Sequence, residues 1–229
     1  MRFGLFPAVS AGWVPTAEEW FPKNDFFTFM KIRGSYGEVG NDRLGGSRRY
    51  YYLPNTYNLN QGGYYLGNND GSSANAYFAG ATEGVLGNPD ITWERSRKYD
   101  VGVETKFFTN RLSVDFDYFY EKRDNILTAA GSVPDYVGID NVAPRNSGKV
   151  LNHGLEAELR IMKQVSRDFS FFANFQVTYA KNKVLENDQP TPKFDYQDLR
   201  GYEIGYDLGY KSLGYFKDQD EIDNSPKQN

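Results

Sequence analysis

The stretch from Asn88 to Phe107 reads NPDITWERSRKYDVGVETKF, and much of it alternates between apolar and polar residues. It opens on Asn88-Pro89-Asp90, a combination typical of turns. The residues after this turn predict one long β-strand, because a period of two places successive side chains on opposite faces. The apolar face carries Trp93, Tyr99, Val101, Val103, Thr105 and Phe107, and the polar face carries Glu94, Ser96, Lys98, Asp100, Gly102, Glu104 and Lys106.

Other segments repeat this alternation, and the connections between them are short and long in turn. The candidate strands are residues 3–13, 26–37, 112–121, 148–162 and 169–179, with a weaker one at 202–216. A strand that crosses a bilayer beside a wet lumen needs about 9–11 residues of such alternation, and short turns alternate with long loops in a membrane barrel. The pattern therefore predicts an all-β antiparallel meander in the wall of a transmembrane β-barrel. A soluble antiparallel β-sandwich that binds carbohydrate is the alternative.

A hairpin joins the opening strand to the next one through a short turn at residues 108–111. The register expected from this turn sets apolar residues opposite one another: Val103 and Phe116, Val101 and Tyr118, Tyr99 and Tyr120. The same register sets Glu104 opposite Asp115. Like charges in that position indicate that the polar face of the hairpin is solvated.

Composition excludes several classes of protein. The 229 residues include no cysteine and one histidine, so a disulfide scaffold, a thiolate zinc site and a histidine metal cluster are excluded. The net charge of −4, with no long basic run, argues against nucleic-acid binding. The 18 tyrosines and 17 phenylalanines are typical of β-structure and of the aromatic girdles at membrane interfaces.

The candidates for catalysis are acidic side chains and His153, and we interpret them as residues of a barrel wall instead. Two pairs of carboxylates each share one face of a strand, as a glycosidase would require. They are Asp115 with Asp117, and Glu156 with Glu158. A hydrated lumen wall has polar residues at the same positions by default. His153 lies on an apolar face, and residues 218–223 lack the glycine of a calcium loop. We therefore expect no catalytic residue, no metal site and no cofactor.

The long connection at residues 41–89 is rich in glycine, asparagine and tyrosine. Tyrosine rings stack on sugars and donate hydrogen bonds at a modest entropic cost, so this loop is the candidate substrate-binding surface. The alternative is a small hairpin in which residues 50–52 pair with residues 64–65. The candidate substrate-binding residues are Tyr50, Tyr51, Tyr52, Tyr57, Tyr64 and Tyr65.

Five short motifs follow one another along the chain in the same order as in a known family. They are FPAVSAGW at 6–13, KIRGSYG at 31–37, NPDITWE at 88–94 with YDVGVE at 99–104, NSGKVLNHGLE at 146–156, and GYKSLGYF at 209–216 with Glu221-Ile222. Over nearly its whole length the chain thus resembles the SusC-like (RagA-like) TonB-linked outer-membrane transporters. Each motif alone is weakly specific, and the shared order makes the resemblance strong.

The resemblance implies that residues 1–229 are part of the carboxy-terminal barrel, which in this class has about 22 strands around a plugged lumen. The plug, the TonB box and the final strands have no counterpart here, and both ends read as cut, so we expect a fragment of a longer chain. The whole protein would lie in the outer membrane of a Gram-negative bacterium, in contact with lipid. It would import oligosaccharides or other nutrients with a SusD-like surface lipoprotein, driven by the TonB complex.

Overall fold

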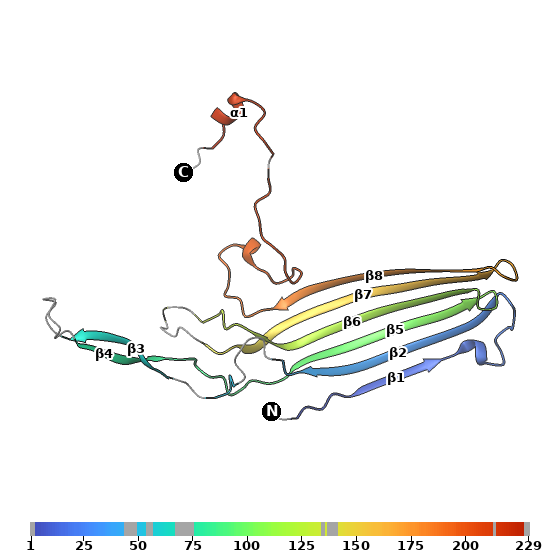
Figure 1. The fold of residues 1–229 in the computed structure, drawn as a ribbon, viewed down its shortest axis with the longest axis horizontal. Coiled ribbons are helices and arrows are strands. Elements are labelled where there is room, and N and C mark those ends of the chain that lie inside the picture. The colour runs from blue at the N-terminus through green and yellow to red at the C-terminus, as the bar shows by residue number, and fades with distance from the viewer. Residues whose placement is uncertain are drawn as a thin grey trace.

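A computed structural model gives the fold and describes residues 3–43, 50–53, 57–66, 76–133, 136, 142–212 and 214–226. Its main feature is a six-stranded antiparallel sheet in the order β1-β2-β5-β6-β7-β8 (Figure 1). Its strands are β1 (Ala8–Trp13), β2 (Phe27–Asn41), β5 (Glu94–Phe107), β6 (Leu112–Thr128), β7 (Arg145–Gln164) and β8 (Ser170–Glu186). A hairpin lies between β2 and β5 in sequence and consists of β3 (Tyr57–Leu66) and β4 (Ala76–Glu83).

Short elements complete the described chain. They are the 3₁₀ turns η1 (Pro15–Ala17) and η3 (Asp195–Gln197) and the helix α1 (Gln219–Asp223). The side chain of Asp218 caps α1 by accepting a hydrogen bond from the backbone N–H of Glu221. No helix in the described ranges is long and apolar enough to cross a bilayer.

The connections alternate in length, as the sequence predicts. Turns at 14–26, 108–111 and 165–169 join strands at one end of the sheet, and the long connections and the β3–β4 hairpin leave from the other end (Figure 1). The turn after β5 places Phe108, Thr109 and Asn110 in the left-handed region, with φ of 52°, 57° and 67°. This backbone conformation is costly for non-glycine residues, and it allows the chain to reverse within four residues.

The register of the β5–β6 hairpin confirms the pairing expected from the sequence. Tyr99 pairs with Tyr120, Val101 with Tyr118 and Val103 with Phe116. The like-charge pair also occurs, with Glu104 opposite Asp115. A one-residue slip would exchange the two faces of the strand, so this register fixes which side chains share a face across the sheet.

The sheet has no second layer of strands packed on it in the described part of the chain. Pro15, Ala143 and Val150 are the only buried residues with apolar side chains there, whereas Val101 is 54% and Val177 62% exposed. A β-sandwich would bury one face of each sheet in a shared core. The structure therefore contradicts the soluble sandwich and agrees with one open stretch of barrel wall, with β1 and β8 as its edges.

Several boundaries differ from the sequence predictions. Strand β1 begins at Ala8 instead of residue 3, and the described residues 202–212 and 214–216 form no strand. In the latter segment Gly205 and Gly214 adopt positive φ, which interrupts an extended conformation. Residues 50–52 form a turn and do not pair with residues 64–65, whose partners are Phe78 and Tyr77 in β4.

Two motif glycines are required because neighbouring groups occupy the space of a side chain. A Cβ at Gly102 would collide with the carboxylate of Asp117 and lie 2.9 Å from the Arg33 guanidinium. A Cβ at Gly154 would collide with the carbonyl oxygen of Tyr179 and lie 2.6 Å from the Phe119 ring. These glycines allow an ion pair and an aromatic ring to lie directly on the sheet.

Substitution of Gly154 tests this packing. Gly154→Val should destabilise the full-length protein by about 3 kcal/mol or more, because its branched side chain meets the backbone of β8. Gly209→Val is the matched control, since a Cβ at Gly209 has no neighbour within 4 Å, and it should change stability by less than about 0.5 kcal/mol. Denaturant unfolding in detergent measures both, and equal stability of the two variants would contradict the packing.

Candidate functional site

Arg33 is the centre of an ion-pair network on the polar face of the sheet. Its guanidinium contacts Asp100 at 3.0 Å, Glu104 at 3.2 Å and Asp117 at 2.6 Å, and these acids come from β5 and β6. Lys31 adds a contact of 3.3 Å to Glu104. Several linked charges hold one another in place better than one exposed pair does, so this network orders the wall and keeps it hydrophilic.

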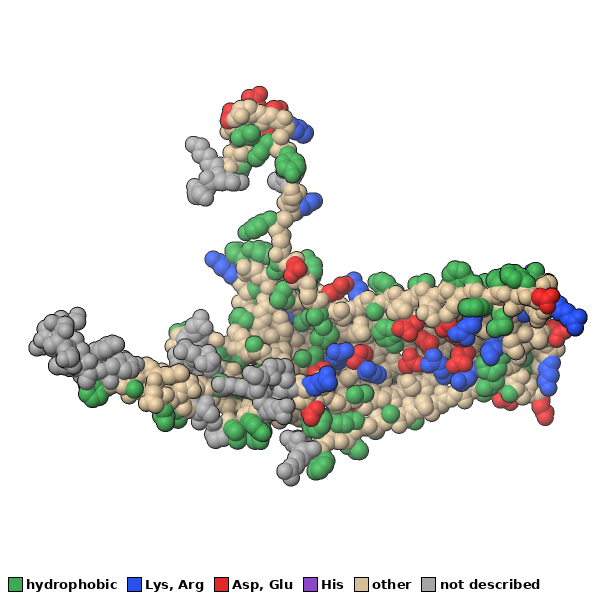
Figure 2. Space-filling model, in the orientation of Figure 1, with side chains coloured by type: hydrophobic (Ala, Val, Ile, Leu, Met, Phe, Trp, Pro, Cys, Tyr) green, Lys and Arg blue, Asp and Glu red, His purple; other side chains and the backbone are tan. Residues whose placement is uncertain are grey.

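A second polar cluster surrounds Glu121, nearer the long-loop end of β6. Ser96 donates a hydrogen bond of 2.6 Å to Glu121, Arg123 donates one of 2.9 Å, and Lys98 lies 3.8 Å away. Both Ser96 and Glu121 are buried. The carboxylate is thus compensated by its neighbours, and the site offers no free acid for proton transfer. Figure 2 shows acidic and basic side chains intermingled along the sheet.

The predicted carboxylate pairs do come together across β6 and β7. Asp115 lies opposite Glu158, and Asp117 lies opposite Glu156. Together with Gln176 and Thr178 of β8 they line an open hollow of about 200 Å³. In the described ranges no group of acidic or histidine side chains is arranged to hold a metal ion. We interpret the hollow as part of a hydrated wall.

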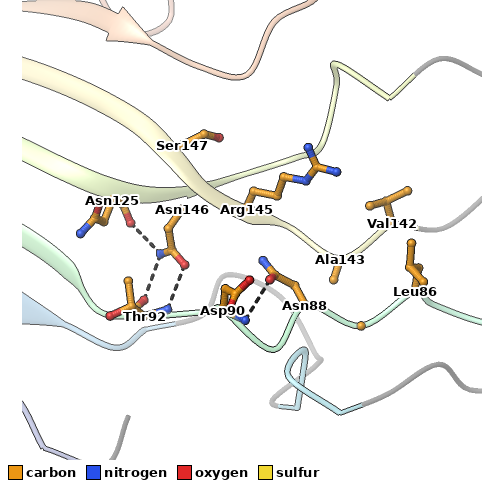
Figure 3. Close-up of a pocket in the computed structure, with 11 residues that line it drawn as sticks. Leu86, Asn88, Asp90, Thr92, Asn125, Val142, Ala143, Arg145, Asn146 and Ser147 are labelled. Carbon is orange, nitrogen blue, oxygen red and sulfur yellow. Dashed lines mark hydrogen bonds between the residues drawn. The ribbon is translucent and has the colours of Figure 1, made fainter.

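Two of the five sequence motifs, at residues 88–94 and 146–156, meet at the long-loop end of the sheet. Asn146 donates from Nδ2 to the carbonyl oxygens of Thr92, at 2.9 Å, and Asn125, at 2.8 Å. Its Oδ1 accepts from the backbone N–H of Thr92 at 2.9 Å (Figure 3). One side chain thus joins the segment before β5, the end of β6 and the start of β7. We call Asn88, Thr92, Asn125 and Asn146 the rim clasp.

Asn88 extends the rim clasp to two further segments. Its side chain donates to the carbonyl oxygen of Pro144 at 3.0 Å and accepts from the backbone N–H of Asp90 at 3.1 Å. Its backbone N–H donates to the carbonyl oxygen of Tyr51 at 2.7 Å. A cavity of about 600 Å³ lies beside these residues, and Arg145 is among those that line it (Figure 3). The clasp therefore fixes where the long loops leave the sheet.

The candidate tyrosines fall into two groups. Tyr50, Tyr51 and Tyr52 lie in the turn that the rim clasp holds, and the rings of Tyr50 and Tyr52 are in edge contact at 6.1 Å. Tyr57 is exposed in β3. The backbones of Tyr64 and Tyr65 belong to β3, and their side chains lie outside the described part of the structure.

The opposite face of the sheet is apolar and is bordered by aromatic residues at both ends. At the long-loop end the rings of Tyr36, Tyr99 and Tyr120 form a row, with centroid distances of 5.0 and 6.0 Å. At the short-turn end Phe107 contacts Phe26 at 5.7 Å and Phe27 at 5.0 Å. Between these rows the outward residues of β5 are Val101, Val103 and Thr105.

Arg95 and Arg97 lie on this same face, beyond Tyr99, although the alternation was expected to extend from Trp93. Arg97 contacts Glu38 at 3.6 Å, and Tyr36 donates a hydrogen bond to the same carboxylate. The apolar character of the face therefore ends at Tyr99. The arginines at 95 and 97 are visible in the sequence and are the signal that could have placed this boundary.

The segment after β8 folds back onto the long-loop end of that strand. Val184 exchanges backbone hydrogen bonds with Gly201, at 2.7 Å, and with Tyr202, at 2.8 Å. In this segment the side chain and backbone of Arg200 donate hydrogen bonds that hold the pKa of Asp198 below its usual range. The pairing of Asp198 with Arg200 stabilises the folded protein at pH values above the ordinary aspartate pKa. This stabilisation is lost as the pH falls through the lowered pKa of Asp198.

Comparison with known proteins connects this geometry to a family. The sequence profile of the family described as TonB dependent receptor-like, beta-barrel matches residues 2–229. TonB-dependent receptor P39 of Formosa agariphila is 28% identical over 217 residues, which are 94% of this chain and 19% of that protein. TonB-dependent receptor SusC of Bacteroides thetaiotaomicron is 22% identical over 185 residues, which are 81% of this chain and 17% of that protein. These relatives are receptors, which agrees with the expectation of a non-enzymatic chain.

Solved structures share the fold at low sequence identity. The RagAB peptide importer in its closed-closed state has a TM-score of 0.65 and 20% identity, and the match covers 86% of this chain and 20% of the other. The RagAB peptide transporter has a TM-score of 0.61 and 20% identity, with coverage of 80% and 18%. The chain spans about a fifth of the length of the curated relatives described above.

Loss of the Asn146 amide should loosen the rim clasp. Asn146→Ala removes three hydrogen bonds and should cost roughly 1–3 kcal/mol, because Thr92 keeps backbone groups without their partner. Limited proteolysis should then cut residues 125–146 faster than in the unaltered protein. Asn58→Ala removes an exposed asparagine of β3 and serves as the control. Equal cleavage rates in the two variants would contradict a structural role for the clasp.

Proposed function

Because this chain belongs to the TonB dependent receptor-like β-barrel family, we propose that it forms part of the wall of a transporter that imports nutrients. The observation that carries the proposal is the contrast between the two faces of one continuous sheet. One face is apolar and framed by aromatic rows, and the other is a network of ion pairs. A β-sheet that separates lipid from a water-filled lumen requires one apolar face and one polar face.

The apolar face matches the thickness of a membrane. From Tyr99 to Phe107 strand β5 rises about 27 Å at ~3.4 Å per residue. A tilt of about 40° reduces this to roughly 20 Å of height, close to the ~25 Å apolar band of outer-membrane barrels. Barrels of this family lie in the outer membrane. The rows of Tyr36 and Tyr99 and of Phe26 and Phe107 lie at the two levels where aromatic girdles occur.

The ion-paired face lines the lumen in this proposal. Its charges are paired with one another, as Arg33 is with Asp100 and Asp117, so a passing solute meets hydrated dipoles instead of a strong field of one sign. Closure of the barrel needs further strands paired with β1 and β8, because a free sheet edge is not tolerated in lipid. Residues 1–229 would supply only part of a barrel of about 22 strands, and a plug and TonB box would lie elsewhere in the complete protein.

The long-loop end faces the extracellular side, where loops of outer-membrane barrels are long. Asn88 to Glu94 then lie at the outer rim, and Thr109 and Asn110 turn in the periplasm. A SusD-like lipoprotein would cover the rim, and the TonB complex would supply energy from the periplasm. Oligosaccharides are the proposed substrate class, because exposed tyrosines stack on sugar rings. The proposed contacts are Tyr50, Tyr51, Tyr52, Tyr57, Tyr64 and Tyr65.

Arginine substitutions at neighbouring positions of β8 test the assignment of the faces. Val177 lies in the same cross-strand row as Val103 and Phe116, at the middle of the apolar band, and Thr178 lies on the polar face. In the full-length protein Val177→Arg should cost about 2–4 kcal/mol at the bilayer midplane, while Thr178→Arg should cost less than about 1 kcal/mol. Unfolding from lipid vesicles measures the difference. Equal costs, or the reverse order, would overturn the wall assignment.

A further inference from the structure

The outward face changes from aromatic to cationic at the long-loop end of the sheet. Register places Tyr36, Tyr99 and Tyr120 in one cross-strand row, and that row continues through His153 to Lys181. The next row toward the loops runs from Glu38 through Arg97, Lys122 and Leu151 to Lys183. Arg95 and Asp124 pair one row further on. We call Arg95, Arg97, Lys122, Lys181 and Lys183 the basic belt.

The two carboxylates of this region are covered, whereas the cations are open to solvent. The side chains of Glu38 and Asp124 are 13% and 14% exposed, compared with 42% for Arg95 and 37% for Arg97. Lys122, at 40%, lies 3.9 Å from Asp124. The two acids are therefore covered by the arginine and lysine side chains that contact them, and the charge that faces outward is positive.

Lys181 and Lys183 add positive charge without a matching acid. Both are exposed, and neither makes an ion pair with any described residue. They follow one another on the outward face of β8, opposite His153 and Leu151. The cations of the belt thus outnumber its carboxylates, and the surplus lies on β8.

The inner face at the same height shows no such surplus. Lys98 and Arg123 both contact the buried Glu121, and Glu94 is a second acid that interacts with Arg123, so two carboxylates balance two cations. In β8 the inward positions next to the belt lysines are Ala180, Asn182 and Val184, which are uncharged. The outward excess is therefore a property of the lipid-facing side and does not reflect a generally basic rim.

We infer that the basic belt binds the phosphate groups of an anionic lipid headgroup in the outer leaflet. Lys181 ends the tyrosine row, and Arg97, Lys122 and Lys183 lie about 7 Å beyond it, since two residues of a strand rise about 6.7 Å. Tyrosine girdles mark the headgroup level, so the belt lies where lipid phosphates are found. Clustered lysine and arginine next to an apolar band recognise anionic lipid by charge, and guanidinium groups bind phosphate with two hydrogen bonds. This inference rests on the membrane orientation proposed above.

The test titrates the full-length protein in detergent with lipid A, a diphosphorylated glycolipid, and with its dephosphorylated form. The Lys181→Gln/Lys183→Gln variant should bind lipid A roughly tenfold more weakly than the unaltered protein. Lys181→Arg/Lys183→Arg should retain binding. The matched control is Lys163→Gln/Arg167→Gln, which removes the same charge at the short-turn end and should leave binding unchanged.

Three results would overturn the inference. They are equal binding of lipid A and its dephosphorylated form, equal losses in the belt variant and the control, and displacement of lipid A by inorganic phosphate at the same phosphate concentration. The last result would indicate a site for free phosphate. A separate measurement tests the orientation: labelling of a Thr109→Cys variant from outside intact cells would contradict the proposed function and leave the detergent result intact.

Discussion

The fold depends on one constraint: in the hydrocarbon core of a bilayer, every backbone N–H and C=O must find its hydrogen-bond partner within the sheet. Water cannot satisfy these groups in the middle of a bilayer, so strands must pair along their whole length and the sheet must close. Strand β7, with 20 residues, is paired almost continuously with β6 on one side and β8 on the other. With the backbone satisfied in this way, the side chains can differ completely between the two faces.

Close packing of charges on the inner face follows from the same pairing. Neighbouring strands lie about 4.8 Å apart, so Arg33 can reach acids on both β5 and β6. That reach is possible only because position 102 carries no side chain. At the rim the ladder ends, and side-chain amides replace it: Asn146 satisfies backbone groups of Thr92 and Asn125 where strand pairing stops.

The local sequence pattern made most of the sheet predictable, whereas contacts between residues distant in the sequence were not predictable from it. The pairing of Tyr99 with Tyr120 follows from a short turn and a period of two, and so do the positions of β7 and β8. The contact of Asn146 with Thr92 joins residues 54 positions apart, and one sequence has no signal for it beyond the presence of two motifs. Residues 202–216 look extended by composition, yet glycines with positive φ interrupt them. The role of the loop tyrosines remains a prediction.

The central claim is that, from Tyr99 to Phe107, odd-numbered residues of β5 face lipid and even-numbered residues face a wet lumen. Nitroxide labels placed singly at residues 99–107 of the full-length protein in lipid vesicles test it most directly. Collision with oxygen, which dissolves in lipid, should peak at 99, 101, 103, 105 and 107, and collision with a water-soluble nickel chelate should peak at the residues between them. Accessibility with no two-residue period, or with the opposite phase, would contradict the account.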